Sequence, residues 1–157
     1  AEGPDGERSI SVDDFFFGMY STALDPGEIV TRVEIPSAAD AVGAYAKKPS
    51  PSSGYAMVGV AALVETDGDT VTRVRIGANG VLDHGIRLES VEETLTGESL
   101  DDETIEAAAS VATEDVDEMM MMSDLQASAE FRATLLDAYT KRALGVVADR
   151  APASAAA

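Results

Sequence analysis

The sequence predicts an α+β domain, in which a small, largely antiparallel sheet is followed by a layer of helices. Residues 42–78 read as consecutive strands, and Thr66-Asp67-Gly68-Asp69 between two of them is a strong signal for a tight hairpin. From residue 87 onward the apolar residues change to helical spacing. Strands first and helices afterwards is the element order of an α+β fold.

The predicted sheet is centred on residues 55–65. Residues 57–64 form an unbroken run of Met, Val, Gly, Ala and Leu. A strand with one wet face would alternate polar and apolar residues, so this run predicts a strand buried on both faces. Before it, Pro49-Ser50-Pro51-Ser52-Ser53-Gly54 cannot continue a central strand and predicts a loop.

Three further strands are predicted around this one. Residues 42–48 precede the loop, and residues 28–36 alternate as a half-buried strand closed by Pro36. Residues 70–78 return from the hairpin. In that strand we expect Thr72, Val74, Ile76 and Ala78 to face inward and Arg73 and Arg75 to face outward.

Three helices follow. Residues 87–95 have helical spacing and stop at Gly97, and Asp101 is a good N-cap for the next helix. A last helix is predicted over residues 128–147, with Ser128 as its cap, before an Ala-rich tail that we expect to fray. The expected inward stripes are Ile105, Ala108, Ala109, Ala112 and Val116, and then Phe131, Leu135, Leu136, Tyr139 and Ala143.

The N-terminal part contains the densest aromatic cluster of the chain, which consists of Phe15, Phe16, Phe17, Met19 and Tyr20. Two interpretations stay open for these side chains. They either anchor this segment onto the core or form an interface to a neighbour.

The net charge of −18 is extreme for 157 residues. It indicates either a solvated acidic surface adapted to high salt or a basic partner. Nucleic acid is not expected as a partner, because the chain has no basic stripe. No apolar run is long enough to span a membrane, and the first nine residues contain no apolar signal core, so we expect a cytoplasmic protein.

The residues themselves indicate no catalytic or metal site. Cysteine is absent, which excludes a cysteine nucleophile or an iron–sulfur cluster ligated by this chain. The single histidine, His84, lies in a predicted turn, and we expect an ordinary surface residue there. Gly77-Ala78-Asn79-Gly80 lacks the spacing of a phosphate-binding loop.

An ordered set of short segments carries a family resemblance between about Arg8 and Leu144. It comprises Asp14-Phe15-Phe16, Thr22-Ala23-Leu24, Pro26-Gly27-Glu28-Ile29, Ala44-Tyr45 with Lys47, Ser53-Gly54-Tyr55-Ala56, Val58-Gly59-Val60-Ala61, Gly80-Val81, Asp124-Leu125, Ala127-Ser128-Ala129-Glu130-Phe131-Arg132 and Arg142-Ala143-Leu144. Together they resemble the C-terminal part of the FAD-binding, medium subunit of molybdenum hydroxylases, above all aerobic carbon monoxide dehydrogenase.

This resemblance implies a division of the chain. Residues 1–24 would be the end of an upstream FAD-binding domain and a connecting segment, residues 25–147 the C-terminal α+β domain, and residues 148–157 the tail. The FAD pyrophosphate would be held mainly upstream of Ala1. The molybdenum cofactor and [2Fe-2S] clusters would belong to partners, namely a molybdenum large subunit and an iron–sulfur small subunit.

The resemblance also implies site residues. It assigns cofactor-binding roles to Lys47, Tyr45 and Asp124, and no catalytic residue and no metal ligand. A cation such as Lys47 would stabilise the negative charge of a reduced flavin. Met119 to Met122 depart from the family pattern and either fill a gap or contact a partner.

The implied function is electron transfer, with a domain that covers and tunes FAD and docks on the iron–sulfur subunit of an oxidoreductase complex. Two alternatives remain. The chain is a stand-alone, non-enzymatic interaction module with the same topology, or it comes from the flavin subunit of a xanthine dehydrogenase-type enzyme.

Overall fold

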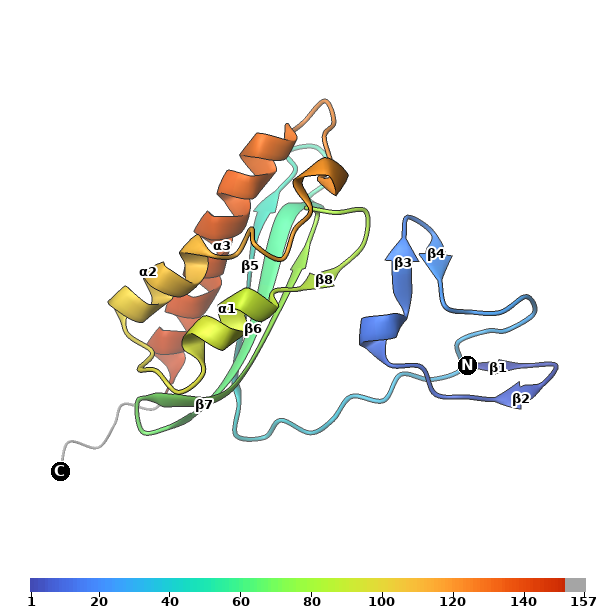
Figure 1. Ribbon diagram of the computed structural model, residues 1–157, viewed down its shortest axis with the longest axis horizontal. Coiled ribbons are helices and arrows are strands. Elements are labelled where there is room, and N and C mark those ends of the chain that lie inside the picture. Colours follow the sequence, from blue (N-terminus) through green and yellow to red (C-terminus); the bar gives the residue numbers. More distant parts are fainter. Residues whose placement is uncertain (152–157) are drawn as a thin grey trace. The chain divides into compact units, whose positions relative to one another are not determined.

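The computed structural model describes residues 1–151. The chain divides into two compact units, one over residues 1–39 and a larger one that begins at Asp40, and each is described by itself. Figure 1 shows the strands and helices of both units.

The larger unit contains a four-stranded antiparallel sheet in the order β5 (Val42–Pro49), β6 (Ala56–Asp67), β7 (Thr70–Asn79), β8 (Ile86–Arg87). The predicted hairpin joins β6 to β7, since Asp67 pairs with Thr70. Helices α1 (Glu89–Leu95), α2 (Asp102–Ser110) and α3 (Ala129–Arg150) follow, with the short turn η2 (Glu118–Met120) before α3. The predicted α+β class and its antiparallel sheet are confirmed.

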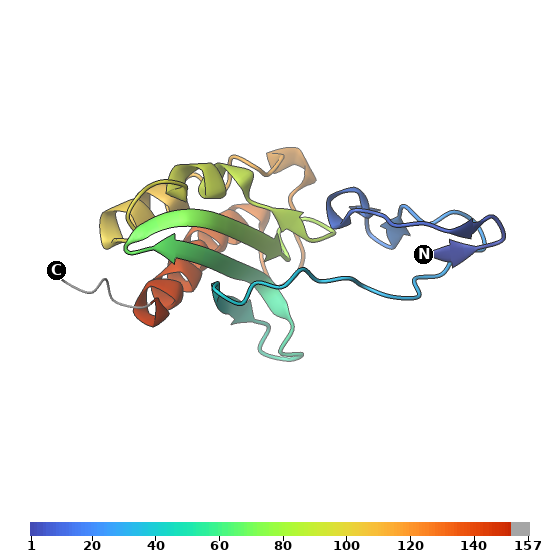
Figure 2. The ribbon, with the colours of Figure 1, turned by 90° about the horizontal axis from the view of Figure 1, so that it is seen from below.

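The helices cover one face of this sheet (Figure 2). The buried core between the two layers combines β6 and β7 side chains with helix residues, among them Val60, Ile76, Leu95, Leu136 and Leu144. Side-chain caps start the two longer helices as predicted. Asp101 accepts from Thr104 N at 2.9 Å, and Ser128 accepts from Phe131 N at 3.2 Å.

The prediction that the central strand is buried on both faces is wrong for its second half. Residues 57–60 of β6 are buried, but Ala61 and Leu63 are exposed while Ala62 and Val64 lie in the core. The residues alternate in space although all are apolar. Ala61 and Leu63 point to the face that the helices of this unit leave open, and hydropathy alone does not reveal that alternation.

Two inward assignments are also wrong. Thr72 is exposed, because the pairing of β6 and β7 shifts register between Glu65 and Thr66, and Val71 takes the buried place. Phe131 is 44% exposed, because the buried stripe of α3 begins at Arg132. The Ala-rich tail predicted from residue 148 begins later, since α3 continues to Arg150, and residues 152–157 lie outside the described part.

The smaller unit contains two short hairpins, β1 (Glu2–Gly3) with β2 (Gly6–Glu7) and β3 (Phe16–Gly18) with β4 (Ser21–Thr22), and the turn η1 (Val12–Asp14). The strand predicted over residues 28–36 is wrong. Only Ile29 forms a bridge, with Glu2, and residues 30–39 have no regular structure. Alternation without a neighbouring strand to pair with does not produce a strand.

A charged cluster ties the smaller unit together. The Arg8 guanidinium donates to both carboxylate oxygens of Glu28 at 2.8 Å and to Ala23 O at 2.6 Å. The hydrogen bond from Arg8, followed by one from Asp25 N, lowers the pKa of Glu28 to about 2.

The aromatic cluster of this unit leaves apolar surface open, since Phe17 and Tyr20 are exposed. Within residues 1–151, no helix is long and apolar enough to cross a membrane.

Candidate functional site

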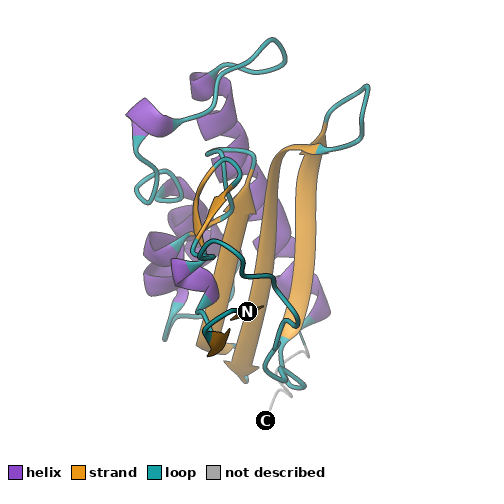
Figure 3. Cartoon of the chain, turned by 90° about the vertical axis from the view of Figure 1, so that its right-hand side faces the viewer, coloured by secondary structure: helices purple, strands orange, loops and turns teal. Residues whose placement is uncertain are grey.

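The candidate site is the open face of the four-stranded sheet, opposite the helices. The strand register places Tyr45 beside Ala61 and Gly77, and Lys47 beside Gly59 and Asn79. Figure 3 shows the strands side by side with the helices behind one face. Because two glycines and an alanine lie in the middle of this face, few side chains project from it there, and the Tyr45 ring lies against it.

Tyr45 lies directly above Gly59. A Cβ atom on Gly59 would overlap the Tyr45 hydroxyl group and would come within 2.5 Å of Asn79 Oδ1. Gly59 is buried under this ring, whereas the Tyr45 side chain itself remains 55% exposed. The missing side chain at position 59 therefore lets the tyrosine ring lie down against the sheet.

Lys47 is fixed at the edge of the same face. Its ammonium group donates to Gly54 O at 2.9 Å. The loop that carries this carbonyl is closed by Ser50 N to Tyr55 O at 2.7 Å and Gly54 N to Ser50 O at 2.9 Å. Gly54 has φ of +71°, a conformation that suits glycine. The loop therefore holds the charge of Lys47 in place beside Tyr45.

Asp124 lies in the loop before α3, and its carboxylate oxygens already have partners. One oxygen accepts from Gln126 N at 2.8 Å and Ala127 N at 3.0 Å, and the other accepts from Arg132 at 2.8 Å. The two backbone N–H groups, with Arg132 after them, lower the pKa of Asp124. The structure thus brings Tyr45 and Lys47 together, while Asp124 belongs to a separate cluster.

Arg132 organises that second cluster and was not singled out from the sequence. Its guanidinium is buried and donates to Met57 O at 2.5 Å and to Gly80 O at 2.6 Å, in addition to Asp124. One signal could have found it. Arg132 has the i, i+3, i+4 phase of the buried stripe that continues with Leu135 and Leu136.

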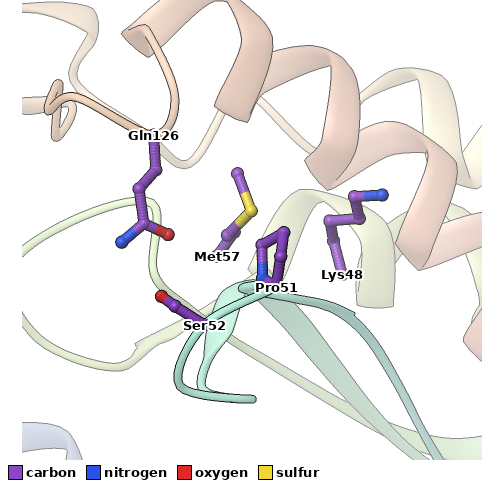
Figure 4. A pocket seen from close by; sticks show the side chains of 5 residues that line it. All are labelled: Lys48, Pro51, Ser52, Met57 and Gln126. Carbon is purple, nitrogen blue, oxygen red and sulfur yellow. The ribbon is translucent and has the colours of Figure 1, made fainter.

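A shallow pocket of about 370 Å³ lies between the 50–54 loop and the loop before α3. It is lined by Lys48, Pro51, Ser52, Met57 and Gln126. Figure 4 shows Met57 at the centre and the ammonium group of Lys48 turned away from Gln126. The pocket therefore presents apolar walls and an amide but does not focus charge. Lys48 has the opposite orientation to Lys47, because neighbouring residues of β5 alternate between the two faces.

The rest of the described chain offers no competing chemistry. His84 pairs with its neighbour Asp83, with 2.7 Å between Nδ1 and the carboxylate. Within residues 1–151, no group of three or more His, Cys, Asp or Glu side chains is arranged to hold a metal ion.

A family model described as the CO dehydrogenase flavoprotein C-terminal domain matches residues 43–147. The chain belongs to this family. Membership confirms the resemblance drawn from the sequence, and the matched range contains the whole sheet apart from Val42 together with nearly all of the helical layer.

Members of the family with known activities are similar to this chain over most of its length. The carbon monoxide dehydrogenase medium chain of Hydrogenophaga pseudoflava is 31% identical over 144 residues, which cover 91% of this chain and 49% of that protein. The nicotine 6-hydroxylase medium subunit of Paenarthrobacter nicotinovorans is 32% identical over 139 residues, which cover 88% of this chain and 48% of that subunit.

Solved structures of similar proteins have the same fold as this chain. Quinoline 2-oxidoreductase from Pseudomonas putida 86 superposes with a TM-score of 0.84 at 31% identity, over 96% of this chain and 51% of the other. Carbon monoxide dehydrogenase from Hydrogenophaga pseudoflava gives 0.85 at 30% identity, over 95% and 51%. The chain therefore spans about half the length of the relatives it matches.

Proposed function

We propose that this chain is part of the FAD-binding, medium subunit of a molybdenum hydroxylase similar to carbon monoxide dehydrogenase. In this proposal the open face of its sheet covers the flavin. The observation that carries the proposal is the pairing of a flat, small-residue surface with Tyr45 and the fixed cation of Lys47, within a domain of this family. The matching relatives are medium chains and subunits of dehydrogenases and hydroxylases.

The residues of the open face fit a flavin ring. Ala61, Gly77 and the half-exposed Tyr45 offer an apolar, nearly planar surface, which suits a planar aromatic group. When bound, FAD would supply the electron-accepting ring. Tyr45 and the sheet would exclude water from one side, and Lys47 would hold a positive charge where negative charge collects on reduction. We expect the phosphate groups to be held by residues outside this chain.

The cofactor-binding role of Asp124 stays a prediction. Its oxygens are occupied by Gln126, Ala127 and Arg132, so it supports the loop before α3 in any case. We further propose that the chain works in the cytoplasm, in a complex with an iron–sulfur subunit and a molybdenum subunit. The absence of cysteine fits an arrangement in which the clusters belong to those partners.

The test of this function is flavin content. The complete gene product, co-expressed with the genes beside it, should be yellow and carry about one FAD per chain, and it should co-purify with an iron–sulfur protein. Lys47→Ala should lower the flavin reduction potential by about 30 mV, the shift given by a loss of about 1.4 kcal/mol in a two-electron couple. A colourless product without such a partner would overturn the proposed function, and the chain would then share only the fold of this family.

Two variants control the potential measurement. Lys47→Arg keeps the charge and should leave the potential close to that of the unmodified protein. Lys48→Ala removes a neighbouring cation that points to the other side of β5, and it should change the potential little. A shift of equal size for Lys47→Ala and Lys48→Ala would mean that net charge alone, and not the place of Lys47, sets the effect.

We also propose that the acidic surface is an adaptation to high salt. With 29 acidic and 11 basic residues, self-repulsion destabilises the folded chain in dilute buffer, and salt screens it. Thermal unfolding should show a Tm that rises by about 5 °C or more from dilute buffer to molar KCl. Neutralising Asp102 and Glu103 of α2 to amides should reduce this rise. A Tm that falls with salt would refute the proposal.

A further inference from the structure

Asn79 lies at one end of a polar row on the open face of the sheet. The strand pairing places Lys47 of β5 opposite Gly59 of β6, and Gly59 opposite Asn79 of β7. Two strand spacings, about 10 Å, separate the backbones of the two polar residues. Lys47 and Asn79 therefore stand on either side of a residue that has no side chain.

The Asn79 side chain points over the same glycine as Tyr45. The place that a Cβ atom on Gly59 would take touches both the Tyr45 hydroxyl and Asn79 Oδ1, so these two oxygens lie beside each other. Neither of the two polar groups has a hydrogen-bond partner within residues 1–151, whereas Lys47 is engaged with Gly54 O. The open face thus presents an amide and a hydroxyl that are available to a ligand.

The polarity of the open face falls along the strands. The row next to Asn79 consists of Tyr45, Ala61 and Gly77. The row after it is centred on Leu63, which is 39% exposed, with Arg75, already in an ion pair, at its end. Successive rows on one face are about 6.7 Å apart. A flat ring system laid along the strands therefore has polar groups beside one end and small or apolar residues beneath the rest.

The backbone around this polar row is held from the helix side of the sheet. The buried Arg132 guanidinium donates to Met57 O, two residues before Gly59, and to Gly80 O, directly after Asn79. Gly80 has φ of +80°, and a Cβ atom there would overlap Met57 O. The end of β7 is thus fixed against the start of β6, and Asn79 is presented from an ordered backbone, as the positioning of a ligand requires.

We propose that Asn79 is a positioning residue for the flavin, and that its amide pairs with the C4 carbonyl and N3–H of the isoalloxazine ring while Lys47 lies on the C2 side. The inference rests on the proposed function, in which the open face covers FAD. A side-chain amide has one acceptor and two donors, so it accepts from N3–H and donates to the C4 oxygen at once. With the amide on one side and the cation on the other, only one of the two faces of the ring can turn towards the sheet.

The isoalloxazine ring has the same asymmetry as this face. Its pyrimidine end carries the carbonyl and N–H groups, which lie between Lys47 and Asn79 in the proposed arrangement. Its other end carries two methyl groups, and these lie towards Leu63. The amide at position 79 therefore selects both the end of the ring that meets the polar row and the face that meets the sheet.

Infrared difference spectra of the complete gene product, loaded with FAD that carries ¹³C at C4, test the contact directly. The label identifies the C4 carbonyl band, and the loss of a hydrogen bond raises the frequency of that band. Asn79→Ala should raise the C4 frequency and leave the C2 carbonyl, which faces Lys47, unchanged. If the C4 band does not move, or if only the C2 band moves, the proposed orientation is overturned.

Flavin affinity and potential supply a second readout. Asn79→Ala should weaken FAD binding about tenfold, because two hydrogen bonds are lost. Asn79→Asp keeps the shape of the side chain but replaces both N–H donors with a charged oxygen. It should weaken the binding of reduced flavin about tenfold more than that of oxidised flavin, which lowers the two-electron potential by about 30 mV. Ser110→Ala removes an exposed hydroxyl from α2, in the helical layer, and should change neither quantity.

A purely structural role for Asn79 predicts a different result. Asn79-Gly80 ends β7, and asparagine favours turns, as aspartate does. If Asn79 only supports this turn, Asn79→Ala lowers the Tm of the flavin-free protein, while Asn79→Asp has the FAD affinity and C4 band of the unmodified protein. That result overturns the positioning role.

The FAD content of the unmodified protein separates this inference from the proposed function. If the unmodified protein binds FAD, and both Asn79 variants bind it equally tightly with unchanged carbonyl bands, the positioning role falls and the proposed function stands. If the unmodified protein binds no FAD, both fall together. A raised C4 frequency with a weakened Asn79→Ala variant and an unchanged Ser110→Ala variant supports the positioning role.

Discussion

Arg132→Met is expected to destabilise the chain by about 2 to 4 kcal/mol. The guanidinium of Arg132 is the shared donor for Met57 O and Gly80 O, and it reaches Met57 from 75 residues away in sequence. A buried carbonyl left without a donor costs roughly 1–3 kcal/mol, and Arg132 serves one buried and one partly buried carbonyl. Asp124 adds less, because its side chain is partly exposed and can be solvated by water. Urea unfolding should give the free energy, and the Tm should fall by about 10 °C.

A second arginine of the same helix controls for the loss of charge. Arg142 is exposed and lies 4.7 Å from the centre of the Tyr139 ring, so Arg142→Met should cost below about 1 kcal/mol. The Arg132 variant should also loosen the loop before α3, which hydrogen exchange at Gln126 and Ala127 would report. An Arg132→Met chain with the Tm of the Arg142→Met chain would show that the buried guanidinium contributes nothing to stability.

Local patterns in the sequence predicted most elements of the larger unit. The hairpin, the caps Asp101 and Ser128 and the stripe from Leu135 to Ala143 depend on residues a few positions apart, and the structure confirms each. Of the proposed site, Tyr45 and Lys47 could be predicted to share a face, because they are two residues apart in a strand. That Tyr45 lies over Gly59 and beside Gly77 could not be predicted, because these glycines belong to the other strands β6 and β7.

The errors have a common physical origin in long-range context. Ala61 and Leu63 are apolar yet exposed, because exposure depends on which face the helices cover and not on hydropathy. Residues 28–36 alternate correctly but have no extended partner strand. Asp124 matched a family motif, whereas its hydrogen bonds to Arg132 depend on how α3 docks on the sheet. Arg132 and Glu92 are buried charged residues within the described range. The phase of the α3 stripe points to the burial of Arg132 but not to its hydrogen-bond partners, which come from distant parts of the chain.

Glu92→Ala is the other substitution from which we expect a large effect, about 3 kcal/mol of lost stability. Glu92 lies on α1 and its side chain is 7% exposed. One carboxylate oxygen accepts from Ile76 N at 2.9 Å and the other from Arg87 at 2.6 Å. The carboxylate thus accepts the hydrogen bond of Ile76 N–H in β7. The short strand β8 pairs only with Gly77 and Ala78, so it supplies no acceptor for this group. Its removal leaves a buried N–H group without an acceptor and takes one ion-pair partner from Arg75 and one from Arg87, which keeps Glu89.

Two neighbouring substitutions separate charge from shape. Glu92→Gln retains an oxygen for Ile76 N–H but removes the charge, so it should lose about half as much stability as Glu92→Ala. Glu93→Ala alters the next residue of α1, which is exposed, and should change stability by less than about 0.5 kcal/mol. If Glu92→Gln is as damaging as Glu92→Ala, the ion pairs with the arginines dominate. If Glu92→Gln is harmless, the hydrogen bond to Ile76 N–H accounts for the stabilisation. If both substitutions are harmless, the carboxylate does not stabilise the sheet at all.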